Sequence, residues 1–416
     1  MSEPLYSNVV SKRKKTIKCG CLAHSRLSEN ESNCHTSSMS ILAEHEYAPA
    51  VETLESTIGD DSRPVGIVMG AGCSSSVVLG GKPLIASIEA LTADVATEVR
   101  ASPLGVALDA LVATHTEDGN AKPTIEDWLS RLRTMASISG DKSTIRGIAS
   151  ADIVELEEAL VTSIAKRVSV DLPDDGGGFD SLARWAAGSN RRHALEIFTL
   201  NYDLLVEQAL ERHRVAYFDG FVGAHQPFMD TRAMEDDNLP IRWARVWKMH
   251  GSVNWRLSDG TVYRTVSGGS SSSSAGSLIH PSNMKYEQSR RGPYLAMQDR
   301  LRSFLRQPGA VIVCLGYSFG DQHINEMIAE GLSGNATAVV FAPLFGELSK
   351  YDEAARLAKR LPNLRLMAFD SAVIGGREGA WRGSSPVDNF GKSPELGDFN
   401  QFAALLNRQS IGAANA

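Results

Sequence analysis

Several features that mark membrane, secreted or disulfide-rich proteins are missing from this sequence. No apolar run approaches the roughly 18 residues that a membrane-spanning helix needs, and residues 1–40 contain no apolar core of signal-peptide length. The 416 residues include only five cysteines, and these lack the spacing of a disulfide framework. We therefore expect a cytoplasmic protein that does not associate with membranes.

Excess positive charge is also missing, because the net charge is −7. Binding to a nucleic-acid backbone needs a basic surface, so we do not expect nucleic acid as a direct partner. One dense basic run, at 12–15, lies in a polar stretch rich in Ser and Asn, which is typical of a solvated segment. We interpret residues 1–48 as a polar, disordered N-terminal tail.

What the sequence does contain, from residue 65 onward, is an alternation of short apolar runs with stretches of helical period. Continuous apolar strands that alternate with helices are typical of a parallel sheet covered on both faces. The sequence thus predicts an α/β fold with a doubly wound parallel sheet. The expected strands are 65–69, 194–200, 215–218, 244–249, 310–315, 338–341 and 364–369, and the expected helices are 203–213, 286–306, 322–332 and 350–360.

Two stretches interrupt this alternation. Residues 83–187 have helical period throughout, which predicts a helical insertion or subdomain; within it, Thr124 and Asp127 have the spacing of a capping box. Residues 267–277 are almost entirely Gly and Ser, which is typical of a flexible loop. We place the main domain at 49–375 and a C-terminal extension at 376–416.

Ligands of doubly wound sheets bind outside the carboxyl ends of the strands, so residues directly after strands are the first candidates for a site. The first strand is followed by Gly70, Ala71, Gly72 and, two positions on, Ser74. Small residues let the backbone approach a pyrophosphate, and a following helix offers amide donors. The alternative is a tight turn in which Ser74 or Ser75 caps a helix.

Two further strand ends carry polar side chains. Asn201 and Asp203 follow the second apolar strand, although either residue is also a good helix cap. His250 follows the strand at 244–249 and precedes a glycine, so it can face a cleft. A histidine that titrates near neutral pH is suited to general base work.

The fourth strand end carries Gly316 and Ser318, beside which a nucleotide can lie against the backbone. Asp321, a few residues later, is most simply the cap of the next helix.

Taken together, the four segments resemble the sirtuin superfamily. The order Gly-Ala-Gly-x-Ser, Thr-x-Asn-x-Asp, His-Gly-Ser and Gly-x-Ser, each at a strand end, carries the resemblance. The stretches 200–203, 249–252 with Trp255, and 316–319 look like the sirtuin-like domains of bacterial anti-phage systems, most of all the short HerA-associated ones. The resemblance covers about 65–370 and implies a Rossmann-like fold that binds NAD⁺.

Residue roles follow from this resemblance by position. Asn201 and Asp203 would face the nicotinamide ribose, and His250 would be the catalytic histidine. The remaining positions would bind the cofactor: Gly70, Ala71, Gly72 and Ser74 at the pyrophosphate and ribose, and Gly316 and Ser318 at the adenosine.

One departure from the family matters. Sirtuins that deacylate proteins carry a four-cysteine zinc module shortly after the catalytic histidine, whereas no cysteine lies between His250 and Cys314 here. The early Cys19, Cys21 and Cys34 have a spacing that matches structural zinc poorly. We therefore expect no zinc-ribbon module and no bound metal.

Without the module that helps to form a peptide channel, water becomes the natural acceptor, and the resemblance implies an NAD⁺ glycohydrolase that depletes NAD⁺ during phage infection. A protein deacylase and a non-catalytic NAD- or ADP-ribose-binding sensor are the alternatives. The resemblance also implies a homo-oligomer and a HerA-like ATPase partner.

Overall fold

The computed structural model describes residues 43–140, 143–235, 238–258, 261–265, 293–382 and 395–414. The predictions for the N-terminal tail up to residue 42, for its three cysteines and for the Gly/Ser loop at 267–277 lie outside these residues. None of the described helices is long and apolar enough to cross a membrane.

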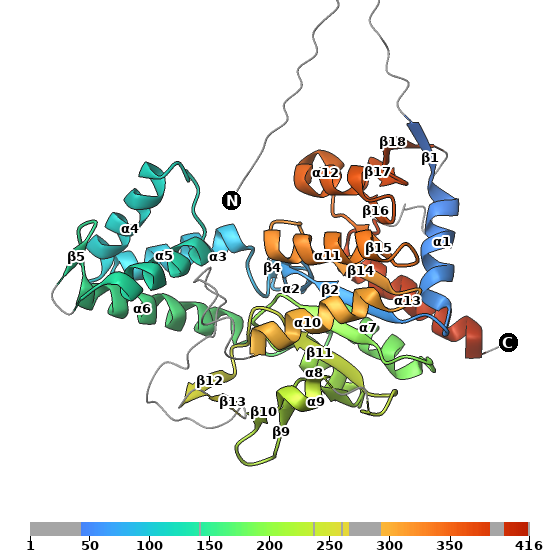
Figure 1. Ribbon diagram of the computed structural model, residues 1–416, viewed down its shortest axis with the longest axis horizontal. Helices are drawn as coiled ribbons and strands as arrows, with labels where there is room; N and C mark the ends of the chain where they lie inside the picture. Colours follow the sequence, from blue (N-terminus) through green and yellow to red (C-terminus); the bar gives the residue numbers. More distant parts are fainter. Residues whose placement is uncertain are drawn as a thin grey trace, which may run out of the picture. The chain divides into compact units, whose positions relative to one another are not determined.

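A ten-stranded sheet forms the centre of the described chain (Figure 1). Its order is β1-β18-β17-β16-β15-β14-β2-β7-β11-β8. The strands are β1 (Ala43–Glu46), β2 (Val65–Met69), β7 (Glu196–Thr199), β8 (Tyr217–Phe218), β11 (Ala244–Lys248), β14 (Val311–Leu315), β15 (Val339–Pro343), β16 (Leu364–Met367), β17 (Ser371–Ile374) and β18 (Arg377–Arg382).

The pairings from β16 through β8 are all parallel. Along the chain, β2, β7 and β11 build the sheet in one direction, after which β14, β15 and β16 build it from β2 in the other. This is the strand order of a Rossmann-type sheet, with the reversal between β2 and β14. The predicted α/β class and parallel sheet are confirmed.

Helices cover both faces, because alternate residues of the strands enter two separate cores. Ile67 of β2 packs in one core, with helices α1 (Tyr47–Gly59), α7 (Gly177–Gly188), α8 (Leu205–Arg212) and α13 (Phe399–Ala414). Val68 packs in the other, with α10 (Pro293–Arg306), α11 (Gln322–Gly334) and α12 (Asp352–Arg360). Gly66 lets Phe304 of α10 lie close to the sheet, since a Cβ there would come within 2.9 Å of the Phe304 ring.

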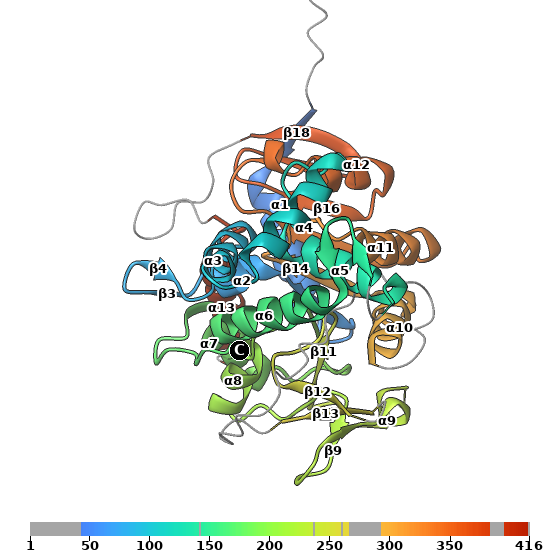
Figure 2. The ribbon, with the colours of Figure 1, turned by 90° about the vertical axis from the view of Figure 1, so that its left-hand side faces the viewer.

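The stretch predicted to be helical, 83–187, consists of two parts. Helices α3 (Ile88–Arg100), α4 (Gly105–Glu117), α5 (Ile125–Ile138) and α6 (Ser150–Val168) contact one another and form a group at the left of Figure 1, which faces the viewer in Figure 2. The predicted capping box of Thr124 and Asp127 begins α5. Helix α7, in contrast, packs on α8 and α13 and so covers the sheet.

Four short strands form a second sheet in the order β12-β13-β10-β9. They are β9 (Phe221–Val222), β10 (Phe228–Met229), β12 (Trp255–Ser258) and β13 (Thr261–Arg264), with helix α9 (Thr231–Glu235) following β10. The remaining elements are the short helix α2 (Ala71–Ser75), the 3-10 turn Leu348–Lys350, and the hairpins of β3 (Val78–Leu79) with β4 (Lys82–Pro83) and β5 (Thr144–Ile145) with β6 (Ile148–Ala149).

The predicted boundaries of the main domain fall inside helix α1 and in the turn between β17 and β18. β1 precedes the boundary at 49 and pairs in parallel with β18, which lies beyond the boundary at 375. Helix α13, which lies in the predicted C-terminal extension, packs on α7. The division into domains stays a prediction, but elements from both flanking regions complete the same compact unit, Leu42–Ala416.

Candidate active site

Four strands of the main sheet end in one row. Leu315 pairs with Met69, Met69 with Thr199, and Thr199 with Lys248. Each of the four segments singled out in the sequence begins within two residues of this row. The register therefore brings them to one edge of the sheet, on both sides of the point where the strand order reverses, which is where ligands of such sheets bind.

The glycines after β2 and β14 pack directly against each other. A Cβ on Gly70 would lie 2.4 Å from the Gly316 carbonyl oxygen, and one on Gly72 would lie 2.7 Å from the Gly316 Cα. Gly316 has φ +58°, and its oxygen accepts a 2.9 Å hydrogen bond from the Gly72 amide. The contact between the two turns thus requires glycine independently of any ligand, while Ala71, Gly72 and Ser318 stay exposed at the edge.

The alternative in which Ser74 or Ser75 caps a helix is wrong. Helix α2 begins at Ala71 after Gly70, which offers no capping side chain, so both serines lie inside the helix. Ser74 is buried with 2% of its surface exposed. Its hydroxyl donates to Asp203 Oδ2 at 2.6 Å, so it faces the second strand end.

Asn201 is held by two acceptors. Its Nδ2 donates to the Gly70 carbonyl at 3.0 Å and to Ser74 Oγ at 2.8 Å. A carbonyl can only accept, so the amide nitrogen must face Gly70 and the amide oxygen Oδ1 must point elsewhere. The side chain is partly exposed. Asn201 therefore presents a hydrogen-bond acceptor in a fixed direction at the strand edge.

Asp203 is buried, and both of its carboxylate oxygens are engaged within the protein. Oδ2 accepts the Ser74 hydroxyl, and Oδ1 accepts the Leu205 amide at 3.0 Å at the start of α8. The alternative in which Asp203 is the N-cap of the helix is wrong, because Leu204 holds that position and Asp203, one residue earlier, accepts among the helix amides only that of the first helical residue. In this arrangement it holds Ser74, which in turn holds Asn201.

His250 forms a pair with Asp321, which the sequence had indicated only as a cap. His250 Nε2 lies 2.8 Å from Asp321 Oδ2, and 15% of the histidine side chain is exposed. Asp321 Oδ1 accepts the amides of His323 and Ile324 and so also caps α11. The carboxylate thereby fixes the orientation of the ring from a different strand end.

Electrostatics at this pair favour a charged histidine. Burial acts to lower the pKa of His250, but the hydrogen bond and charge of Asp321, with smaller contributions from Glu126 and the Leu200 backbone, raise the pKa above its ordinary value. Burial acts to raise the pKa of Asp321, and the contact with His250 lowers it overall. His250 is thus suited to take up a proton, with Asp321 stabilising the imidazolium.

The loop that carries Asp321 is itself fixed. The Tyr317 hydroxyl donates to Asn325 Oδ1 at 2.7 Å, and Asn325 Nδ2 donates to the Phe319 carbonyl at 2.8 Å. Phe319 adopts φ +60°, a conformation uncommon for a non-glycine residue. The sequence offered a signal for Asp321, an acid six residues after a strand end, but did not show that it meets His250.

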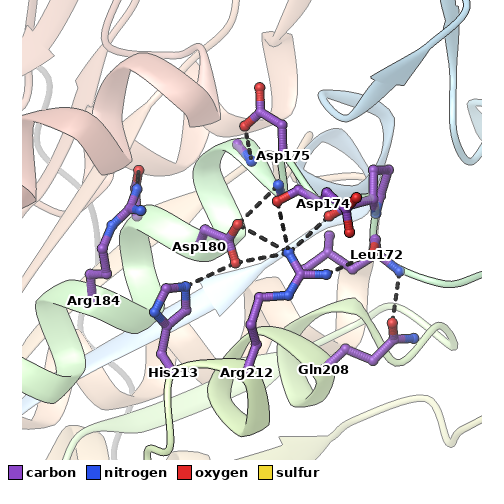
Figure 3. Close-up of polar contacts among 12 residues, drawn as sticks. Leu172, Asp174, Asp175, Asp180, Arg184, Gln208, Arg212 and His213 are labelled. Carbon is purple, nitrogen blue, oxygen red and sulfur yellow. Dashed lines mark hydrogen bonds and ion pairs between the residues drawn. The ribbon is translucent and has the colours of Figure 1, made fainter.

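A second histidine–carboxylate pair joins α7 to α8 (Figure 3). His213 Nε2 lies 3.0 Å from Asp180 Oδ1. Asp180 also accepts from Arg212 at 3.1 Å and from the Gly176 amide at 3.0 Å. His213 lies between α8 and β8, and β8 runs parallel to β11, so His213 is near the amino ends of the strands, opposite the candidate site. Sequence reasoning singled out none of these residues.

Two cavities occur away from the strand-end row. One, of about 340 Å³, is lined by residues that include Arg63, Asn363 and Arg365; the other, of about 520 Å³, by residues that include Asp352 and Lys359. Neither includes a candidate site residue. No group of three or more His, Cys, Asp or Glu side chains among the described residues is arranged to hold a metal, and the expectation of a metal-free protein stays a prediction.

Comparison with known proteins identifies a SIR2-like domain over residues 195–364. This stretch is less than half of the 416 residues; it includes Asn201, His250 and Asp321 but not the turn after β2. No curated protein matches the chain.

Two solved structures were also found to be similar. A Sir2 homologue in complex with NAD has a TM-score of 0.41 and 14% identity, over 89% of this chain and 96% of that one. A Sir2 homologue variant in complex with ADP-ribose has a TM-score of 0.38 and 14% identity, over 88% and 98%. Similarity at this level carries no argument about the ligands of this chain.

Proposed function

We propose that the protein hydrolyses the nicotinamide–ribose bond of NAD⁺, releasing nicotinamide and ADP-ribose. The observation that carries the proposal is the placement of a fixed amide oxygen, on Asn201, and a carboxylate-oriented histidine, His250, two residues beyond one row of paired strands. The SIR2-like domain over 195–364 contains both residues and supports NAD⁺ as the ligand.

Hydrolysis of the nicotinamide–ribose bond requires one group that positions water and one that accepts its proton. Cleavage of a glycosidic bond proceeds through an oxocarbenium-like transition state, in which the leaving nitrogen takes the bonding electron pair and positive charge develops at the anomeric carbon. Asn201 Oδ1 can accept a hydrogen bond from a water molecule and so direct the oxygen of that water toward the anomeric carbon. His250 can then accept the proton that the water loses, and Asp321 stabilises the resulting cation.

The exposed backbone at the neighbouring turns supports the rest of the assignment. Ala71, Gly72 and Ser318 are exposed at the same edge, where the pyrophosphate and adenosine of NAD⁺ would lie. Ser74 and Asp203 are engaged with each other, so we assign them the task of holding Asn201 and not direct contact with the ribose. Gly70 and Gly316 would allow the two turns to pack against each other below the bound NAD⁺.

The test is nicotinamide release from NAD⁺ by the purified full chain. Wild type should release nicotinamide, and Asn201→Ala and His250→Ala should not, while His213→Ala serves as a control because it removes a histidine of similar setting far from the strand ends. An acetylated peptide offered together with NAD⁺ separates hydrolysis from deacylation: acetyl transfer to ADP-ribose, with no release in the absence of peptide, would overturn the proposal. Binding of NAD⁺ that persists without turnover would instead favour a sensor.

The cellular role belongs to the same proposal. We propose that the protein is cytoplasmic and acts in anti-phage defence, as a homo-oligomer together with a HerA-like ATPase. Assaying nicotinamide release with and without a co-expressed ATPase tests the partnership, since activity that is identical in both samples would contradict control by such a partner.

A further inference from the structure

A buried lysine lies directly beneath the candidate site. Lys248 is the last residue of β11 and has 1% of its surface exposed. Its Nζ donates to the carbonyl of Asp203 and lies 3.2 Å from Glu207 Oε1. One residue separates this lysine from His250 along the chain, yet its side chain contacts Asp203 and not His250.

The pair that Lys248 forms with Glu207 is incompletely satisfied. Glu207 is buried, and burial raises its pKa although the charge of Lys248 acts to lower it. Its second oxygen, Oε2, has no hydrogen-bond partner among the residues that the structure describes. A buried ion pair contributes little net stability compared with apolar side chains of similar volume, because both charges lose their hydration. Stability alone therefore gives little reason for a lysine at this position.

The position of Lys248 gives a better reason for a lysine there, because a series of hydrogen bonds connects it to Asn201. Lys248 fixes the Asp203 backbone, and the Asp203 carboxylate accepts the Ser74 hydroxyl proton at 2.6 Å. With its proton directed there, Ser74 Oγ must turn a lone pair toward the Asn201 amide, which donates to it at 2.8 Å. The Ser74 hydroxyl has a single proton, so its donation to Asp203 fixes the direction of the bond from Asn201, while the Asn201 amide also donates to the Gly70 carbonyl.

We propose that Lys248 is a positioning residue for Asn201: from within the sheet it fixes Asp203, and through Asp203 and Ser74 it holds the Asn201 amide in place together with the Gly70 carbonyl. This inference deepens the proposed function and rests on it for its catalytic meaning. The structural part, that Lys248 controls how Asn201 is held, stands independently of turnover.

The test replaces the ion pair as a unit. Lys248→Met combined with Glu207→Gln removes both charges and leaves no buried charge without a partner, so the protein should remain folded. The matched control is Arg300→Met combined with Glu196→Gln, which removes the buried 3.0 Å ion pair at the first residue of β7 and keeps an acceptor for Trp247. Thermal unfolding establishes that both double variants are folded at the assay temperature.

The first readout needs no activity. In protein labelled with ¹⁵N-asparagine, the side-chain amide signal of Asn201 is assigned by its loss in Asn201→Ala. We expect this signal to shift and its hydrogens to exchange faster in the Lys248/Glu207 variant, and to match wild type in the Arg300/Glu196 variant. An unchanged Asn201 signal in a folded Lys248/Glu207 variant would overturn the inference.

The second readout is the kinetics of nicotinamide release. Since small displacements of a reacting group can cost about 100-fold in rate, kcat should fall by about 10- to 100-fold in the Lys248/Glu207 variant, with KM within about threefold of wild type. Equal losses in both double variants would identify a general structural effect and overturn the inference. If wild type itself releases no nicotinamide, the proposed function fails, and the Asn201 signal alone decides the role of Lys248.

Discussion

Two histidine–carboxylate pairs have nearly equal lengths, His250–Asp321 at 2.8 Å and His213–Asp180 at 3.0 Å. The first lies at the carboxyl ends of the strands and the second toward their amino ends. Asp180 also binds an arginine and a backbone amide, and it joins two helices (Figure 3). The Asp321 carboxylate meets a histidine from another strand end, and its second oxygen accepts two amides of its own helix. A histidine–carboxylate contact alone therefore does not distinguish the two pairs, whereas their places in the sheet and their other partners do.

The largest expected difference between the two pairs is in catalysis. General bases contribute about 10²- to 10⁴-fold in rate, so His250→Ala should lower nicotinamide release by that factor. The rate of nicotinamide release by His213→Ala should stay within about threefold of wild type, because a substitution away from the site acts mainly on stability. Initial rates at saturating NAD⁺ measure both, and a loss in His213→Ala equal to that in His250→Ala would remove the distinction.

The second largest difference should be between the two carboxylates, Asp321 and Asp180, in their effect on turnover and on its pH dependence. Asp321→Asn keeps the shape of the side chain but removes the charge that raises the pKa of His250. We expect kcat to fall by about 10- to 100-fold. A general base must be neutral, so activity rises with pH through the pKa of His250, and this limb of the profile should move to lower pH in the variant. A profile that keeps its wild-type limb would show that Asp321 does not act through His250, and Asp180→Asn is the control that should leave it in place.

Stability should show the reverse order. Asp180→Ala leaves Arg212 and His213 without their shared acceptor, and hydrogen bonds to charged groups contribute about 1.5 to 3 kcal/mol. Urea unfolding should therefore give a free energy of unfolding lower by about 2 kcal/mol, with nicotinamide release per folded molecule unchanged. A normal stability together with reduced turnover would place the Asp180 cluster in catalysis.

The smallest expected effect is the pH dependence of stability at the His250–Asp321 pair. The pKa of His250 is raised, so its contribution is complete below its ordinary value of 6.5 and is lost as pH rises through the raised pKa. The pKa of Asp321 is lowered, so its contribution is complete above 3.8 and is lost as pH falls through the lowered pKa. Between wild type and Asp321→Asn, the difference in unfolding free energy should be about 1 to 2 kcal/mol at pH 5.5 and smaller at pH 9. A difference that grows toward pH 9 would contradict the direction of the shift.

Sequence reasoning was most successful where a strand is buried on both sides. The apolar runs predicted at 65–69 and 310–315 correspond to β2 and β14, whose residues are all buried. It failed at the sheet's far edge, where β18 has the mixed sequence Arg-Glu-Gly-Ala-Trp-Arg and gives neither a continuous nor an alternating apolar pattern. That strand forms because β17 and β1 are available to pair with it.

The candidate site shows the same division. The residues that follow the strands could be predicted from local chemistry, because apolar runs and glycines mark strand ends, and these residues included Asn201 and His250. Three contacts became evident only from the fold: Gly316 packs on Gly70 and Gly72, Asp321 pairs with His250, and Lys248 binds the Asp203 carbonyl. These contacts join residues 45 to 246 positions apart, and no local pattern specifies which side chains meet once the register of the sheet has brought four strand ends into one row.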